Sequence, residues 1–117
     1  AELGAAAPTA QLIAYMLANA DLALGHPGEA RSAARGLTAA ALDSVEPDND
    51  WPARLNLQQA ELAYSESPAE PHRQQLGAAL AAIRTARDDD RDALYTQGAA
   101  LLGETSRTAG GQATARR

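Results

Sequence analysis

Apolar residues recur every three or four positions through most of the chain, which is the spacing of one face of an α-helix. Between residues 8 and 24 the apolar stripe is wide, so the helix predicted there is expected to contact neighbours on two sides. The stripe consists of Ile13, Leu17, Ala20 and Leu24, flanked by Leu12, Tyr15, Met16 and Leu22. Gly25 then suits a left-handed helix stop, and Pro27 suits the first position of a new helix. The pattern predicts a tight helical hairpin.

The same spacing predicts three more helices after this hairpin. The second helix of the hairpin is expected over residues 27–45, and the next two over residues 52–64 and 71–87. Acidic residues over 88–92 open a fifth helix that closes at Gly103. Residues 104–117 are polar and lack apolar periodicity, which predicts a disordered tail. The chain is therefore expected to form a single helical domain over residues 8–103.

Composition favours helices over strands. About a quarter of the residues are alanine and most large apolar residues are leucine, the strongest helix formers. The aromatic residues are Trp51, Tyr15, Tyr64 and Tyr95, so strand-forming side chains are scarce. We expect an all-α fold of four or five antiparallel helices, arranged as a stack of hairpins or as an up-and-down bundle.

Charge and cysteine content exclude several classes of partner. The net charge is -5 and arginines alternate with acids, so no basic stripe is available for nucleic acid. The absence of cysteine excludes disulfides, thiolate zinc sites and cysteine nucleophiles. No apolar run approaches the roughly 20 residues that span a bilayer, so membrane insertion is not expected. The chain starts at Ala1 instead of Met, which fits a mature exported form or a trimmed chain. The compartment stays open between a soluble cytoplasmic protein and an exported one.

No motif in the chain points to catalysis or to a cofactor. A Gly-rich phosphate loop, a nucleophile elbow and an H-E-x-x-H pattern are all missing. His26 and His72 each adjoin a proline at the start of a helix, and we interpret them as turn residues in preference to a shared metal site. The segment "PDNDW" lacks the Gly and Glu of a calcium loop and is interpreted as a turn. We therefore expect no catalytic residue, no metal site and no cofactor.

Two further features are interpreted locally. The run "DDDRD", residues 88–92, is interpreted as a helix cap whose acids favour the positive end of the helix dipole. Trp51 precedes a helix in a polar turn, where it either plugs the end of the bundle or is an exposed interface anchor. The plug is the interpretation we prefer.

The first hairpin has a partial repeat later in the chain. The segment "LANADLALG" from Leu17 aligns with "LQQAELAYS" from Leu57, pairing Ala20 with Ala60 and Asp21 with Glu61. The helices that follow also align if the second hairpin loop is about three residues longer. Two alanine-rich and leucine-rich helices also align by composition alone, so both explanations stay open.

The segment "LANADLALGHPGEA" resembles the middle of a tetratricopeptide repeat. In that family a leucine next to a small residue, a small residue at the turn and an alanine in the second helix let two helices pack closely. Leu17 with Ala18, Gly25 and Ala30 match those positions. Other positions that usually hold large or aromatic residues in the family differ here: Ala14, Asp21, Pro27 and Ala34.

The resemblance implies a concave groove that binds an extended peptide. In the family the first helices of successive hairpins line this groove, which here would present six partner-binding residues: Tyr15, Asn19, Leu22, Leu55, Gln59 and Leu62. The alternative is that the three leucines belong to the core. We therefore expect a noncatalytic protein-binding or peptide-binding module that acts as a scaffold or adaptor. The alternative function is a self-associating four-helix bundle, such as a homodimer, with a structural, small-ligand or metal-binding role.

Overall fold

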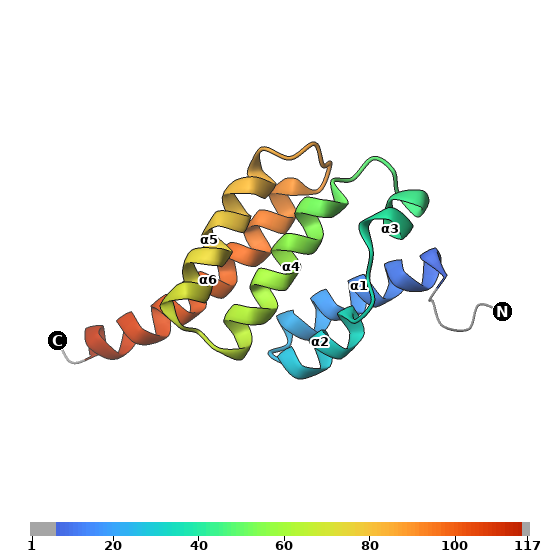
Figure 1. The fold of residues 1–117 in the computed structure, drawn as a ribbon. Helices are drawn as coiled ribbons and strands as arrows, with labels where there is room; N and C mark the ends of the chain where they lie inside the picture. Colours follow the sequence, from blue (N-terminus) through green and yellow to red (C-terminus); the bar gives the residue numbers. More distant parts are fainter. Residues whose placement is uncertain (1–6, 116–117) are drawn as a thin grey trace.

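The computed structural model describes the backbone of residues 7–115 and the side chains of residues 7–103. This part of the chain folds into six helices and contains no strand. The helices are α1 (Pro8–Ala23), α2 (Pro27–Ala34), α3 (Ala39–Val45), α4 (Trp51–Glu66), α5 (Glu70–Arg84) and α6 (Arg91–Ala115) (Figure 1). The prediction of an all-α fold is confirmed.

Helices α1 and α2 form the predicted hairpin. Gly25 has a φ of 81°, the left-handed conformation that a glycine adopts without steric cost. The backbone N–H of His26 donates to the carbonyl of Asp21 at 2.8 Å, which closes the end of α1, and Pro27 begins α2. Gly25 therefore ends α1 and Pro27 begins α2, as the sequence predicted.

The prediction of one continuous helix over residues 27–45 is wrong. Helix α2 ends at Ala34, Gly36 has a φ of 82°, and α3 begins only after Thr38. Thr38 caps α3 by accepting from the backbone N–H of Ala41 at 3.3 Å. Its own N–H donates to Oε1 of Gln11 at 2.9 Å, so a side chain of α1 replaces the lost helical hydrogen bond. This break makes the number of helices six.

Helices α4, α5 and α6 pack side by side as a second unit (Figure 1). Asp50 caps α4 by accepting from the N–H of Ala53 at 3.1 Å, and Pro52 lies in its first turn. Helix α5 buries the stripe that its periodicity predicted. The core of this unit is the largest apolar cluster of the described side chains: Leu57, Ala60, Tyr64, Leu76, Ala79, Leu80, Ile83 and Ala86.

Helix α4 joins the two units because it contacts each of the five other helices. Leu62 packs with Ala18, Leu22 and the buried alanines of α2. Trp51, at the other end of α4, packs with Tyr15 and with the Leu42 side chain of α3. The helical hairpins are therefore arranged around one central helix, and that helix positions the polar residues considered next.

Helix α6 runs beyond the predicted domain boundary at Gly103. Its backbone continues as helix through the first part of the segment expected to be a disordered tail, as far as Ala115. Residues 116–117 of that segment lie outside the described part of the chain. Within the described helices, no stretch is both long enough and apolar enough to cross a bilayer.

Candidate functional site

Four polar residues follow one edge of α4, and we call them the polar seam: Arg54, Gln58, Glu61 and Ser65. Their spacing of four, three and four residues places them on one helix face. The first three are buried, with 5%, 1% and 3% of their surface exposed. Hydrogen bonds and close contacts direct this edge toward α1 on one side and α6 on the other. A buried polar group destabilises a folded protein unless it has a hydrogen-bond partner, so a row of such groups needs an explanation.

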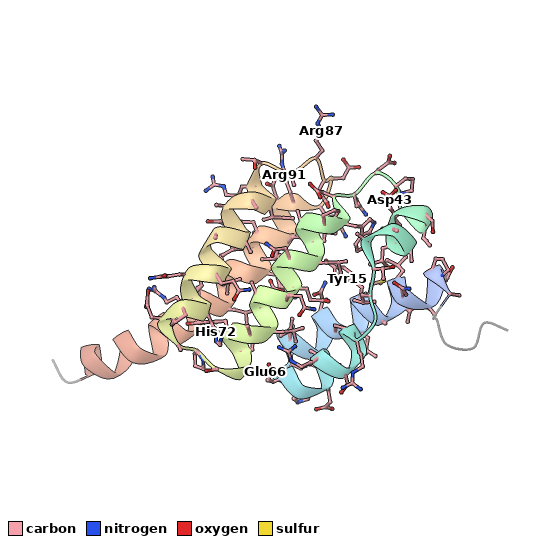
Figure 2. The ribbon with its side chains drawn as sticks, viewed as in Figure 1. Tyr15, Asp43, Glu66, His72, Arg87 and Arg91 are labelled. Atoms are coloured by element: carbon pink, nitrogen blue, oxygen red, sulfur yellow. The ribbon has the colours of Figure 1, made fainter. Side chains whose placement is uncertain are left out.

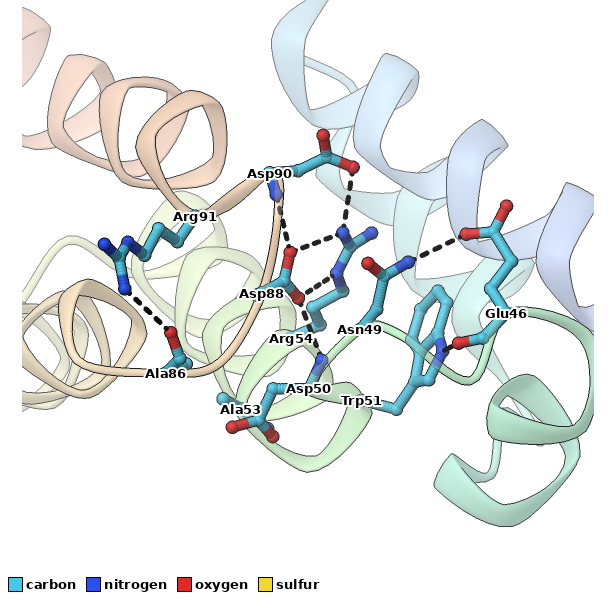
Figure 3. A network of polar contacts seen from close by, with 10 residues as sticks. All are labelled: Glu46, Asn49, Asp50, Trp51, Ala53, Arg54, Ala86, Asp88, Asp90 and Arg91. Carbon is cyan, nitrogen blue, oxygen red and sulfur yellow. Dashed lines mark hydrogen bonds and ion pairs between the residues drawn. The ribbon is translucent and has the colours of Figure 1, made fainter.

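Arg54 closes one end of the seam through a buried ion pair. Its Nε and Nη2 atoms donate to the two carboxylate oxygens of Asp88 at 2.6 and 2.7 Å, and Nη2 also donates to Asp90 at 2.9 Å (Figure 3). Asp88 further accepts the backbone N–H groups of Asp50 and Asp90. This paired geometry ties the start of α4 to the loop that precedes α6.

The electrostatics of this pair favour its charged form. Burial alone would raise the pKa of Asp88, but its hydrogen bonds from Arg54 and from backbone N–H groups outweigh burial and lower that pKa. Burial likewise opposes the charge on Arg54, and the carboxylates of Asp88 and Asp90 reverse the effect, so the pKa of Arg54 is raised. The run "DDDRD" thus supplies an ion pair between α4 and the loop before α6, whereas its sequence favoured a helix cap.

Aromatic rings cover the Arg54 end of the seam. The Trp51 ring lies 5.0 Å from the guanidinium carbon, within cation–π range. Tyr15 packs edge-on against Trp51 with ring centroids 4.9 Å apart, and it lies between α1 and α4 (Figure 2). The indole N–H donates to the carbonyl of Glu46 at 2.9 Å (Figure 3). Trp51 is fully buried, so the plug interpretation is confirmed.

Gln58 occupies the middle of the seam and is only half satisfied. Its Nε2 group donates to the carbonyl of Tyr15 at 3.1 Å and to Oδ1 of Asn19 at 2.9 Å. Because the backbone carbonyl of Tyr15 can only accept, turning the Gln58 amide over would lose that bond. Its Oε1 atom is buried and accepts no hydrogen bond from any described residue. This arrangement leaves one carbonyl oxygen without a donor.

Glu61 is the third member of the seam and faces α6. A Cβ atom built on Gly98 would lie 2.9 Å from Oε2 of Glu61, so only a glycine lets α6 approach this carboxyl group so closely. Among the residues described, none donates a hydrogen bond to Glu61 or forms an ion pair with it. Burial raises the pKa of Glu61 to about 8. At neutral pH the isolated protein therefore holds this acid mostly in its protonated form.

A pocket of about 340 Å³ opens at the Ser65 end of the seam. Helix α6 contributes Gln97, Ala100 and Leu101, while α4 contributes Ser65. The remaining wall comes from the α1–α2 hairpin: Leu22, Ala23, Gly25 and Pro27. Gln97 also donates to the carbonyl of Asn19 at 3.3 Å, which connects α6 to α1 beside the pocket.

The six residues expected to line a peptide groove do not share one surface. Tyr15, Leu22 and Leu62 are buried in the protein's own core. Asn19 and Leu55 are half-buried, and Asn19 accepts from Gln58. Gln59 is exposed and lines a shallow hollow beside α2. The structure brings Tyr15 and Asn19 to the polar seam and Leu22 to Leu62, and their binding role stays a prediction.

The exposed apolar residues lie on the opposite face of α1, which we call the outer face of α1: Ile13, Met16, Leu17, Ala20 and Leu24. The four large side chains are 53% to 69% exposed. Asp21 is the one charged residue within α1. The sequence predicted contacts on two sides of this helix; among the described residues, α2, α3 and α4 contact α1, and its outer face stays exposed.

His26 lies in the expected turn, whereas His72 lies in the first turn of helix α5. His26 is exposed at the start of α2, and Nδ1 of His72 lies 2.7 Å from the carbonyl of Ser67. Within the described residues, no group of three or more His, Asp or Glu side chains is placed to hold a metal ion.

Sequence reasoning missed the polar seam. Its signal was present as polar residues at helical spacing, Arg54, Gln58 and Glu61, but the same helix contains other polar residues that are exposed, such as Asn56 and Gln59. Such a row ordinarily indicates a solvated face, so the sequence could reveal the row but not its burial.

No protein-family model matches the chain, and no curated protein or solved structure matches it. The tetratricopeptide resemblance therefore remains an expectation from the residues of the first hairpin.

Proposed function

We propose that this protein is a noncatalytic protein-binding module whose binding surface is the outer face of α1. The observation that carries the proposal is the exposure of four large apolar side chains at helical spacing: Ile13, Met16, Leu17 and Leu24. A contiguous apolar patch on a protein surface is typical of an interaction site.

The composition of α1 supports a further neighbour on its outer face. A surface helix ordinarily places charged residues on its outer side, and a helix that is apolar on all sides is ordinarily buried. Helix α1 contains no basic residue, and its one acid, Asp21, lies near its C-terminal end. Its core side is filled by Tyr15, Ala18 and Leu22. Its outer face therefore has the composition of an interior surface.

The chemistry of the outer face defines the partner. With no arginine or lysine and a single acid on the helix, the face offers little to a charged partner surface. Ala20 lies within the stripe and lets another backbone approach closely. Covering each half-exposed side chain contributes roughly 1 to 2 kcal/mol. The partner that fits is a helix of another protein that presents an uncharged apolar stripe.

This surface differs from the peptide groove expected from the resemblance. Tyr15, Leu22 and Leu62 would have to leave the core before they could contact a peptide. The outer face of α1 requires no such rearrangement, so the proposal keeps the function class and assigns it to another face of the same helix.

Paired surface variants test the proposal. We expect the double variant Ile13→Gln, Leu17→Gln to lose a partner that the wild type captures from the source cell and binds again after purification. The control is Ala78→Gln, Ala81→Gln, which adds the same amide groups at exposed positions of α5 and should retain the partner. Amide chemical shifts of α1 should move when the purified partner is titrated. Equal binding by both variants, or shifts confined to other helices, would overturn the proposal.

Self-association is the second candidate, and the uncharged character of α1 favours it. A second copy would meet the same apolar face without bringing like charges together, apart from Asp21. Sedimentation equilibrium over a wide range of protein concentration separates the two candidates. A mass that doubles with concentration in the wild type, and not in the Ile13→Gln, Leu17→Gln variant, would identify the partner as another copy of the chain.

A further inference from the structure

The pocket at the Ser65 end of the seam is lined by both apolar and polar side chains. Leu22, Pro27 and Leu101 provide apolar surface, while Ser65 and Gln97 provide polar groups. Its volume of about 340 Å³ falls in the range of small-molecule sites. The pocket lies where α1, α4 and α6 meet, so one ligand would contact both units of the fold.

Glu61 lies directly along the seam from this pocket. It precedes Ser65 by one helical turn on the same edge of α4, a spacing at which side chains are neighbours. On α6, the pocket residue Gln97 adjoins Gly98, the residue that lies against the Glu61 carboxyl group. Neither Glu61 nor Gln58 lines the pocket itself; along this edge of α4, Glu61 comes directly after Ser65 and Gln58 follows one turn further on.

Two side chains of the seam lack a hydrogen-bond partner among the described residues: Gln58 has a free acceptor, and Glu61 becomes an acceptor once its carboxyl group loses its proton. Oε1 of Gln58 is buried without a donor among the described residues, and Glu61 receives no hydrogen bond from them. Arg54, the cation on the same edge of α4, is held by Asp88 and Asp90 at the far end. A neutral donor would therefore satisfy Gln58 alone, whereas a cationic donor would satisfy Gln58 and also stabilise Glu61 as a carboxylate.

We propose that this pocket binds a small primary amine with an apolar chain, whose ammonium group pairs with Glu61 and whose chain lies against Leu22, Pro27 and Leu101. The ammonium group supplies three donors, enough to reach the carboxylate and the free oxygen of Gln58. This site is distinct from the outer face of α1 and does not depend on the proposed protein-binding function.

Binding changes the protonation of Glu61. In the isolated protein the buried carboxyl group holds a proton at neutral pH because burial raises its pKa. An ammonium ion stabilises the carboxylate, so the complex contains the ion pair and the proton passes to the buffer. Tyr15 faces the same region from α1 and its pKa is raised by burial, so its phenol stays neutral. Helix α6 faces Glu61 with Gly98, which carries no charge.

Calorimetry with hexylamine and hexanol tests the site, because the two probes share a chain and differ in the charged head. We expect the wild type to bind hexylamine about tenfold or more tightly than hexanol at neutral pH. Repeating the titration in buffers of different ionisation enthalpy should show release of about one proton per hexylamine bound and none per hexanol. Equal affinity for the two probes, or no binding of either, would overturn the proposal.

Two variants of α4 locate the binding group. Glu61→Gln should bind hexylamine and hexanol equally and release no proton, while Glu66→Gln should behave as the wild type because Glu66 lies on the exposed side of α4. Circular dichroism and thermal melting establish that each variant is folded. If Glu61→Gln is folded and retains the preference for hexylamine, the amine is bound elsewhere and the assignment of Glu61 is wrong.

Discussion

The two units of the molecule are built from similar alanine-rich and leucine-rich helices, but they bury them differently. Helices α4 to α6 surround one large apolar cluster, whereas α1 to α3 pack around two smaller ones. The smaller clusters contain several alanines, and both need a side chain from α4, Leu62 or Trp51, to be complete. The unit formed by α1 to α3 therefore depends on α4 for its core.

The outward faces of the two units differ as well. Helix α5 presents polar residues such as Glu70, Arg73 and Gln74 to solvent and buries a single apolar stripe. Helix α1 buries one apolar stripe and exposes another. A helix with one apolar side needs one neighbour, and a helix with two needs a partner that the described residues do not supply. This difference is what the proposed binding role of α1 rests on.

Two arginine–carboxylate pairs are expected to differ most in their contribution to the free energy of unfolding. Arg54 and Asp88 are buried inside the α4 to α6 unit, whereas Arg31 of α2 and Glu66 of α4 meet at the surface. We expect Asp88→Asn to lower the free energy of unfolding by about 3 to 5 kcal/mol, because it leaves a buried guanidinium without its main partner. Urea denaturation measures the change.

The matched control is Glu66→Gln, which breaks the exposed pair. The side chains of Arg31 and Glu66 are 45% and 34% exposed, so solvent screens their charges. The free energy of unfolding is therefore expected to fall by less than about 1 kcal/mol. Similar losses for the two variants would show that burial does not distinguish these pairs.

Two isoleucines provide the next comparison, since the same substitution is made on each helix. Ile83 of α5 is fully buried and Ile13 of α1 is 61% exposed. We expect Ile83→Ala to lower the free energy of unfolding by about 2 to 4 kcal/mol, through lost burial and a cavity. Ile13→Ala should change it by less than about 0.5 kcal/mol in the isolated protein. A large loss at Ile13 would mean that its face is already covered in solution.

The raised pKa of Glu61 makes the free energy of unfolding depend on pH. Its pKa is about 8 in the folded protein because of burial, against 4.5 for a solvent-exposed glutamate, so the folded state binds more protons between these values. Stability is therefore expected to fall as pH rises from about 5 to 8, by at most about 1.4 kcal/mol per pH unit, and to level off above. Tyr15 and Arg54 keep their charge states through this range.

The variant Glu61→Gln removes the titrating group from this site. We expect it to flatten the decline in stability and to raise stability at pH 8 by about 1 to 3 kcal/mol. Denaturation curves at several pH values measure both effects. An unchanged slope in the variant would assign the pH dependence to another group.

The helices themselves could be predicted where local chemistry decides them. The spacing of Leu76, Leu80 and Ile83 identified α5, and Gly25 with Pro27 identified the first hairpin turn. The break at Gly36 escaped prediction because the apolar spacing continues across it. Its stabilising contact, Thr38 with Gln11, joins residues 27 positions apart, and sequence periodicity carries no information about such contacts.

The candidate sites were harder to predict for a related reason. Apolar residues surround α1, so their spacing could not show whether the side with Tyr15 or the side with Ile13 meets the core. Arg54 and Asp88 are 34 positions apart, and their pairing arises only when α4, α5 and the loop before α6 are packed together. Burial of a polar row is a property of the tertiary arrangement.

The position of Trp51 gives the protein a built-in optical reporter. It is the single tryptophan of the chain, and its ring contacts Tyr15 of α1 and Leu42 of α3 while it belongs to α4. Its fluorescence therefore responds to separation of the first three helices from α4, whereas loosening of α5 leaves its surroundings largely intact. Comparing emission with the far-ultraviolet signal of all helices distinguishes stepwise undocking from cooperative unfolding without any added label.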